Sequence, residues 1–183
     1  MILGMFRHRA YDRTIARLYG AIVAQARAVA FYADYGVPDT VEGRFDLIVL
    51  HMVLVLDRLG RSKPAGRSLG QALFDAFCRD MDGNLREMGV GDLAVPKKMQ
   101  QFGEAFYGRQ TVYAAALAAS DPQAFEKAVA RNIFGGAGSE NKAARLASYA
   151  RAALAGLNAE ADSALLRGEV AFPKPEAIVD AGA

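Results

Sequence analysis

The chain has 183 residues, of which 52% are apolar and 23% are charged, a composition typical of a globular protein with a sizeable core. Its formal net charge of +2 is too small to indicate nucleic-acid binding by the whole chain, so we expect no DNA partner. A single cysteine and two distant histidines exclude an internal disulfide framework and a local metal motif, so we expect no metal or other cofactor.

The first predicted helix spans residues 11–32. Ile15, Leu18 and Ile22 recur at spacings of three and four, as in an amphipathic helix of a bundle. Residues 1–33 carry five arginines and one acid, so the polar face of this helix is basic. We interpret that face as solvated. A second interpretation is peripheral contact with an anionic membrane, with the apolar residues 1–6 as the tip.

The segment at residues 45–59, FDLIVLHMVLVLDRL, is apolar almost all round, which predicts a central, buried helix. Buried polar groups need partners, so we interpret its Asp46, His51 and Arg58 as a structural polar core. An alternative is the pocket of a small-ligand carrier or an enzyme near these three side chains. No nucleophile–base pair or phosphate loop accompanies them, so we expect no catalytic residues.

Two further helices, at about 68–86 and 96–119, follow a basic loop at residues 61–67. Gly89 suits the end of the first helix and Pro96 suits the first turn of the second, so residues 89–96 form an elbow.

The polar positions of this helical hairpin form a candidate partner-binding surface, which we call the hairpin surface. Gly108 lies mid-helix, where it costs about 1 kcal/mol relative to alanine, and this indicates a kink or the close approach of another backbone. We expect Arg109, beside the apolar stripe, to pair with Asp82. The hairpin surface comprises Asp82, Arg86, Glu87, Gly91, Asp92, Lys97, Lys98, Gln101, Glu104, Gly108 and Arg109.

The rest of the chain predicts a helix at 122–133, a glycine-rich turn and a helix at 140–168. The turn lacks the GK[ST] ending of a phosphate-binding loop. We therefore predict an all-α, single-domain bundle of about six helices over residues 1–168, with a flexible start at residues 1–10. Residues 169–183, with two prolines, are expected to form an extended or disordered tail.

Three segments carry a family resemblance: FDLIVLHMVLVLDRL, LFDAFCRDMDGNLREMGVGDLAVPKKMQQFGEAFYGRQTVY and FEKAVARNIFGG. In order and spacing they resemble the ubiquinol–cytochrome c chaperones, the assembly factors of the cytochrome bc1 complex. The resemblance covers about residues 11–157. It implies a helical, non-catalytic chaperone that binds newly made cytochrome b and assists assembly of the bc1 complex of the respiratory chain.

The mitochondrial relatives also bind the ribosome and act with a small partner protein, which the resemblance makes candidate partners here. The chain shows no clear presequence or extra N-terminal domain and so looks like a bacterial-type member. The expected location is the cytoplasm, with peripheral contact at the inner membrane; the mitochondrial matrix is less favoured. A nascent membrane helix offers apolar side chains, so Met81, Met88 and Met99 would suit an adaptable groove lining. For each methionine singly, packing in the core is the simpler interpretation.

Overall fold

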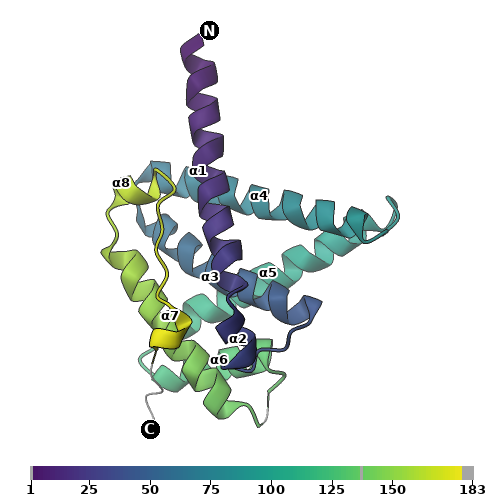
Figure 1. Cartoon of the computed structure of the whole chain (residues 1–183), viewed down its shortest axis with the longest axis vertical. Helices are drawn as coiled ribbons and strands as arrows, with labels where there is room; N and C mark the ends of the chain where they lie inside the picture. Colours follow the sequence, from purple (N-terminus) through teal and green to yellow (C-terminus); the bar gives the residue numbers. More distant parts are fainter. Residues whose placement is uncertain (1, 137, 179–183) are drawn as a thin grey trace.

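The structure is a computed structural model that describes residues 2–136 and 138–178. Within these ranges the chain is all-α and contains no strand, so the predicted fold class is confirmed (Figure 1). Each predicted helix is present, although the first and the last are broken. The elements are α1 (Ile2–Ala26), α2 (Val29–Ala33), α3 (Val41–Arg61), α4 (Pro64–Glu87), α5 (Val95–Ala118), α6 (Pro122–Ile133), α7 (Glu140–Ala159), α8 (Asp162–Leu165) and the 3₁₀ helix η1 (Pro175–Ala177).

The predicted basic loop at residues 61–67 is mostly helical, which corrects the sequence interpretation. Helix α4 already begins at Pro64. The first N–H groups of a helix have no partner within it, so proline, which has no N–H, loses no hydrogen bond at this position. The loop is reduced to Ser62 and Lys63, which have extended backbone angles. A connection this short forces α3 and α4 to lie against each other.

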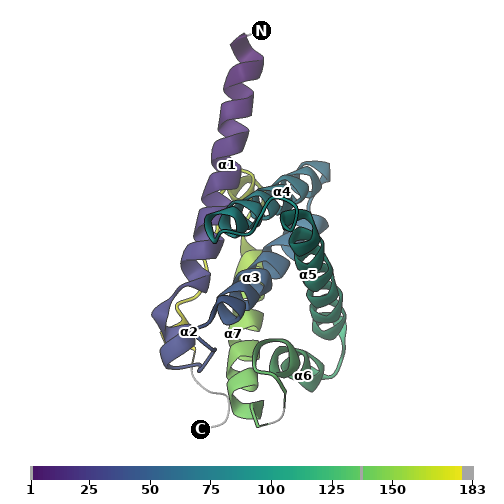
Figure 2. The same cartoon turned by 90° about the vertical axis from the view of Figure 1, so that its right-hand side faces the viewer.

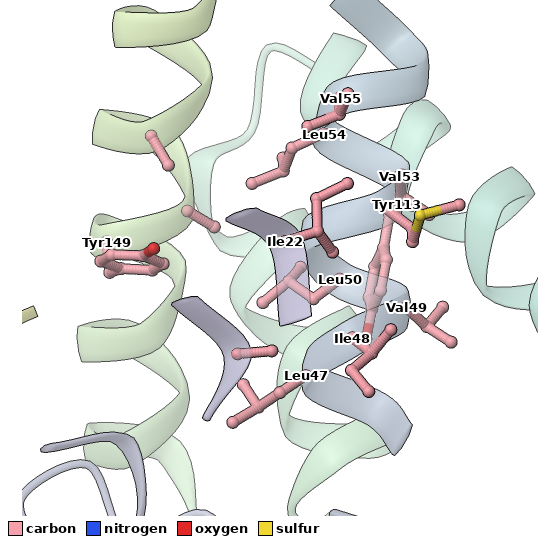
Figure 3. Packing of buried hydrophobic residues seen from close by; sticks show 14 of the residues in the cluster. Ile22, Leu47, Ile48, Val49, Leu50, Val53, Leu54, Val55, Tyr113 and Tyr149 are labelled. Atoms are coloured by element: carbon pink, nitrogen blue, oxygen red, sulfur yellow. The ribbon is translucent and has the colours of Figure 1, made fainter. Parts of the chain in front are cut away.

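Helix α3 occupies the centre of the molecule, as its apolar circumference predicts. Leu47, Leu50 and Leu54 have no exposed surface. In Figure 3 these side chains point from α3 towards Ile22 of α1 and Tyr149 of α7, which belong to the same cluster. Helices α1, α4, α5, α6 and α7 all contact α3. Burying an aliphatic side chain of this size contributes roughly 1.5–3 kcal/mol, so α3 supplies much of the driving force for folding.

Two parts of the molecule extend away from this core. Helix α1 projects as an arm beyond the other helices, and the α4–α5 hairpin projects sideways (Figures 1 and 2). The Tyr19 hydroxyl donates to Asp80 at 2.7 Å and the Tyr11 hydroxyl donates to the Ser68 carbonyl at 3.0 Å, which fastens α1 to α4. No helix of the described chain combines the length and apolar character that crossing a membrane requires.

The long helix predicted over residues 140–168 ends at Ala159. Arg58 of α3 explains the break, because its guanidinium donates to the carbonyl of Leu157 at 2.9 Å and to that of Glu160 at 2.8 Å. The last carbonyls of a helix lack hydrogen-bond donors within that helix, and here Arg58 of α3 provides the missing donors. The chain then turns through α8.

The described part of the tail, residues 169–178, packs back onto the helices. Gln25 donates to the Pro173 carbonyl at 3.0 Å, and the Tyr35 hydroxyl donates to the Pro175 carbonyl at 2.7 Å. Gly168 begins this return with φ of +79°, and a Cβ there would lie 2.7 Å from the Thr14 carbonyl, so the turn requires glycine. Residues 179–183 of the predicted tail lie outside the described residues.

His51 is fully buried and both of its ring nitrogens have partners. Nδ1 donates to the Leu47 carbonyl at 2.7 Å, and Nε2 accepts from the Tyr149 hydroxyl at 2.9 Å. Tyr149 in turn accepts from Gln25 at 3.0 Å, so one chain of hydrogen bonds joins α1, α7 and α3. Both bonds use the neutral imidazole, and burial lowers the pKa of His51 to about 4.

This arrangement predicts a pH dependence of folding stability. The unfolded chain binds a proton at His51 below its ordinary pKa of about 6.5, whereas the folded chain binds it only near 4. His51 should therefore remove about 3 kcal/mol from the free energy of unfolding as pH falls through this window. Urea unfolding of the wild type and His51→Gln, followed by circular dichroism, measures the difference.

The variant should be less stable near neutral pH, because it loses hydrogen bonds, but the gap should close as pH falls towards 4. Other titrating groups remain in both proteins, so comparing the two isolates His51. A gap that stays constant with pH would contradict the neutral, doubly bonded imidazole.

Candidate functional site

The elbow between α4 and α5 is present where the sequence predicts it. Gly89 adopts φ of +80°, the left-handed conformation that ends many helices. The Val90 amide then donates to the Leu85 carbonyl at 3.0 Å, which closes the last turn of α4. Pro96 lies in the first turn of α5. The hairpin tip is therefore an ordered turn made by local hydrogen bonds.

An ion-pair network holds the tip. Arg86 contacts Asp82 one turn earlier at 2.7 Å and also pairs with Asp92 on the far side of the turn. All three side chains are well exposed to solvent, which screens their attraction. The network therefore positions the loop more than it stabilises the fold. Asp82 is occupied by Arg86, so it is not the partner of Arg109 that the sequence analysis expects.

The predicted polar stripe on α5 faces solvent. Lys97, Gln101, Glu104 and Gly108 are all exposed, and Glu104 accepts a hydrogen bond from Gln100 at 2.9 Å. The close approach of a backbone predicted at Gly108 is absent from the described chain, since a Cβ there would meet no atom within 4 Å. The glycine leaves an open gap in the helix surface. The other exposed members of the hairpin surface are Glu87, Gly91 and Lys98.

The exposed apolar side chains of the tip are Met88 and Leu93. Met88 is 59% exposed, whereas Met81 is buried and Met99 is half-buried in the packing of the hairpin. Leu93 was not singled out, yet it is 99% exposed. Its signal in the sequence is an isolated leucine in a glycine-rich turn, immediately after the charged Asp92. Two apolar side chains thus lie beside the ion-pair network.

Arg109 is half-buried, with 24% of its side chain exposed, and it faces α3 rather than standing with the exposed stripe. Its guanidinium lies 2.7 Å from the Asp46 carboxylate, and it also lies 5.9 Å from the ring centroid of Phe45. The physical reason is its position on α5: it lies on the side that packs on α3, where Asp46 would otherwise be a buried charge without a partner. Burial raises the pKa of Asp46 to about 6, although Arg109 acts to lower it.

The three polar residues of α3 do not converge on one pocket. Asp46 pairs with α5, His51 bonds to Tyr149 of α7, and Arg58 bonds to the end of α7 and, at 2.7 Å, to Asp162. Asp46 thus connects α3 to α5, whereas His51 and Arg58 connect it to two different places on α7, and Arg58 also reaches α8. Across the described ranges, no group of three or more histidine, cysteine, aspartate or glutamate residues is arranged to hold a metal ion.

Residues 33–172 match the family model described as ubiquinol-cytochrome C chaperone. The chain belongs to this family. Its fold is similar to the crystal structure of the Cbp3 homolog from Brucella abortus, with a TM-score of 0.88 and 38% sequence identity. The match covers 98% of this chain and 100% of the Brucella chain. A search of curated proteins finds no match. The resemblance seen in the sequence is therefore confirmed at the level of family.

The ion pair of Asp46 and Arg109 predicts how this chaperone responds to loss of one partner. Arg109→Met removes the cation that favours the ionised carboxylate, so the pKa of Asp46 should rise further and the fold should lose about 1–2 kcal/mol near neutral pH. In the wild type, Asp46 already lowers stability as pH rises from about 4 to about 6, because its pKa in the folded state exceeds the ordinary 3.8. The variant should extend this loss to higher pH.

Urea unfolding monitored by circular dichroism tests this, since the chain has no tryptophan. The matched control is the double variant Asp46→Asn, Arg109→Met, which should recover most of the loss near neutral pH. If Arg109→Met is equally destabilised with and without Asp46→Asn, the guanidinium acts through packing and the ion-pair account fails.

Proposed function

We propose that this family member is a non-catalytic assembly chaperone that binds newly made cytochrome b through its hairpin surface. Family membership supports a role in assembly of the bc1 complex. The observation that carries the choice of surface is the exposed, ordered hairpin tip with Leu93 and Met88 beside the Arg86 ion pairs. Arg109 is left out of the proposed surface because it faces α3 and pairs with Asp46.

The chemistry of the tip suits a segment of a membrane protein. Such a segment presents apolar side chains and little charge, so a binding surface for it needs apolar contacts within a polar rim. Leu93 and the flexible thioether of Met88 supply apolar contacts, and Lys97 and Glu104 supply the rim. The open gap at Gly108 lets another helix approach the backbone of α5 closely.

The alternative of an enzyme or small-ligand carrier is less well supported. Its candidate residues Asp46, His51 and Arg58 each bond to a separate structural partner, which leaves no convergent set of free polar groups. We therefore assign them to folding rather than to chemistry.

We place the chaperone in the cytoplasm with peripheral contact at the inner membrane. The projecting α1 arm carries a basic face, with Arg13 and Arg17 exposed, which suits anionic lipid headgroups. Contact with the ribosome or with a small partner protein, implied by mitochondrial relatives, stays a prediction.

Photo-crosslinking in cells tests the client and its surface together. A photoreactive residue at position 97 or 104 should capture cytochrome b. Leu93→Asp and Gly108→Leu should each lower that capture and the amount of assembled bc1 complex several-fold. Both positions are open to solvent, so neither change should disturb folding.

Gly20→Leu is the matched control, because Gly20 also lies in an exposed helix with open space around its Cβ, on α1. It should leave assembly unchanged. Normal bc1 assembly in folded Leu93→Asp and Gly108→Leu proteins would refute the proposed surface, and capture of only unrelated proteins would refute the client.

A further inference from the structure

A cavity of about 200 Å³ lies where α3, α4 and α5 meet, away from the hairpin tip. Sites for cofactors and drug-sized ligands enclose roughly 300–1,000 Å³, so this cavity is too small for them and suits one or two side chains. It is partly open to solvent. Its walls are formed by Leu56 and Gly60 of α3, Arg67 and Phe74 of α4, and Phe106 and Tyr107 of α5. We call it the α4–α5 cavity.

The apolar wall of the α4–α5 cavity is aromatic. The ring centroids of Phe74 lie 4.8 Å from Phe106 and 5.4 Å from Tyr107, so the three rings form one packed group. Tyr107 is 55% exposed, which leaves much of its ring without a packing partner. Aromatic rings add favourably to such a group in offset or edge-to-face contact. Gly60 also lines the cavity, and an added Cβ there would meet no atom within 4 Å, so the wall is open at this position.

The wall of the α4–α5 cavity is positively charged. Arg67 is the charged residue that lines the cavity, and no acid does. The described part of the chain offers Arg67 no ion-pair partner. A guanidinium binds a carboxylate through two parallel hydrogen bonds, and the Gln110 amide also lies on the wall. The Gln71 amide, by contrast, already donates to Asp75 at 2.9 Å. The cavity therefore complements an aromatic ring that stands next to a carboxylate.

We propose that the α4–α5 cavity docks a peptide segment of a partner protein that presents an aromatic side chain beside an aspartate or glutamate. The ring packs against Phe74 and Tyr107, and the carboxylate pairs with Arg67. Aromatic side chains and arginine are enriched among the few residues that supply most of the binding energy of protein–protein interfaces. The cavity lies along the hairpin from its tip and shares no residue with the hairpin surface, although Tyr107 is next to Gly108. Its argument uses neither the tip nor cytochrome b, so it does not rest on the proposed function.

The test uses the whole chain, labelled with ¹⁵N, and the probe Ac-Gly-Phe-Asp-Gly-NH₂. Titration should give saturable amide shifts at Gly60, Gly70 and Gln71, with a dissociation constant on the order of 1 mM, as suits one anchor. Replacing Phe by Ala in the probe should weaken binding about tenfold or more, because the ring supplies the buried area. Replacing Asp by Asn should weaken it several-fold at low salt.

Two variants examine the cavity directly. Gly60→Leu places a side chain on the cavity wall, where an added Cβ has open space, and should abolish binding, whereas Gly20→Leu, an equally open helical glycine outside it, should not. Arg67→Gln should bind the Asp and Asn probes equally. Absence of saturable shifts, or unchanged binding by folded Gly60→Leu, would overturn the proposal. So would shifts at these residues that depend on protein concentration alone, which would assign the cavity to a second copy of the chain.

Discussion

Burial of α3 on every side is the constraint on which the structure depends. Because its circumference is apolar, α3 is stable only when other helices surround it, and five of them do. Three polar side chains within the buried helix then decide how those neighbours are placed. Asp46 bonds to α5, His51 to α7, and Arg58 to the carbonyls that end α7. Unpaired, each would cost several kcal/mol, so Asp46 constrains the position of α5, and His51 and Arg58 together constrain that of α7.

The α4–α5 hairpin differs from the rest because it extends beyond the length that α3 can cover (Figure 1). Near α3, Phe77 and Phe106 pack in the core. At the tip, local hydrogen bonds and the pairs of Arg86 with Asp82 and Asp92 hold the turn. A tip of this kind can keep its shape while exposing Leu93 and Met88. Leu93, at 99%, is the most exposed of the large apolar side chains in the described chain, and its place on an ordered tip is the basis for proposing this surface.

The sequence predicts those features that depend on local patterns. The apolar run of α3 and the glycine and proline of the elbow have strong signals, and both were located correctly. Features that depend on distant side chains were predicted wrongly. The end of α7 at Ala159 depends on Arg58, about a hundred residues earlier in the chain. The partner of Arg109 depends on which acid lies across from it, and spacing along one helix cannot distinguish Asp46 from Asp82.

The exposure of Leu93 was missed for a related reason. A single leucine in a short turn belongs to no periodic pattern, so its sequence context does not indicate whether it is buried or exposed. The family could nevertheless be assigned from the sequence, because a resemblance over long segments does not depend on knowing which distant side chains are in contact. The resemblance still does not reveal which side chains of the hairpin face outward.

The Asp46–Arg109 pair connects the core to that outward face. Burying a charged pair gains little stability, and apolar residues of similar volume often serve as well or better. Its geometric effect is more definite. Successive residues of an α-helix are rotated by about 100°, so holding Arg109 against α3 sets the direction in which Gly108 and Glu104 point. Rotation of α5 would break the pair before it could bury the exposed stripe. The costly interaction inside the molecule thus defines the surface that the chaperone presents.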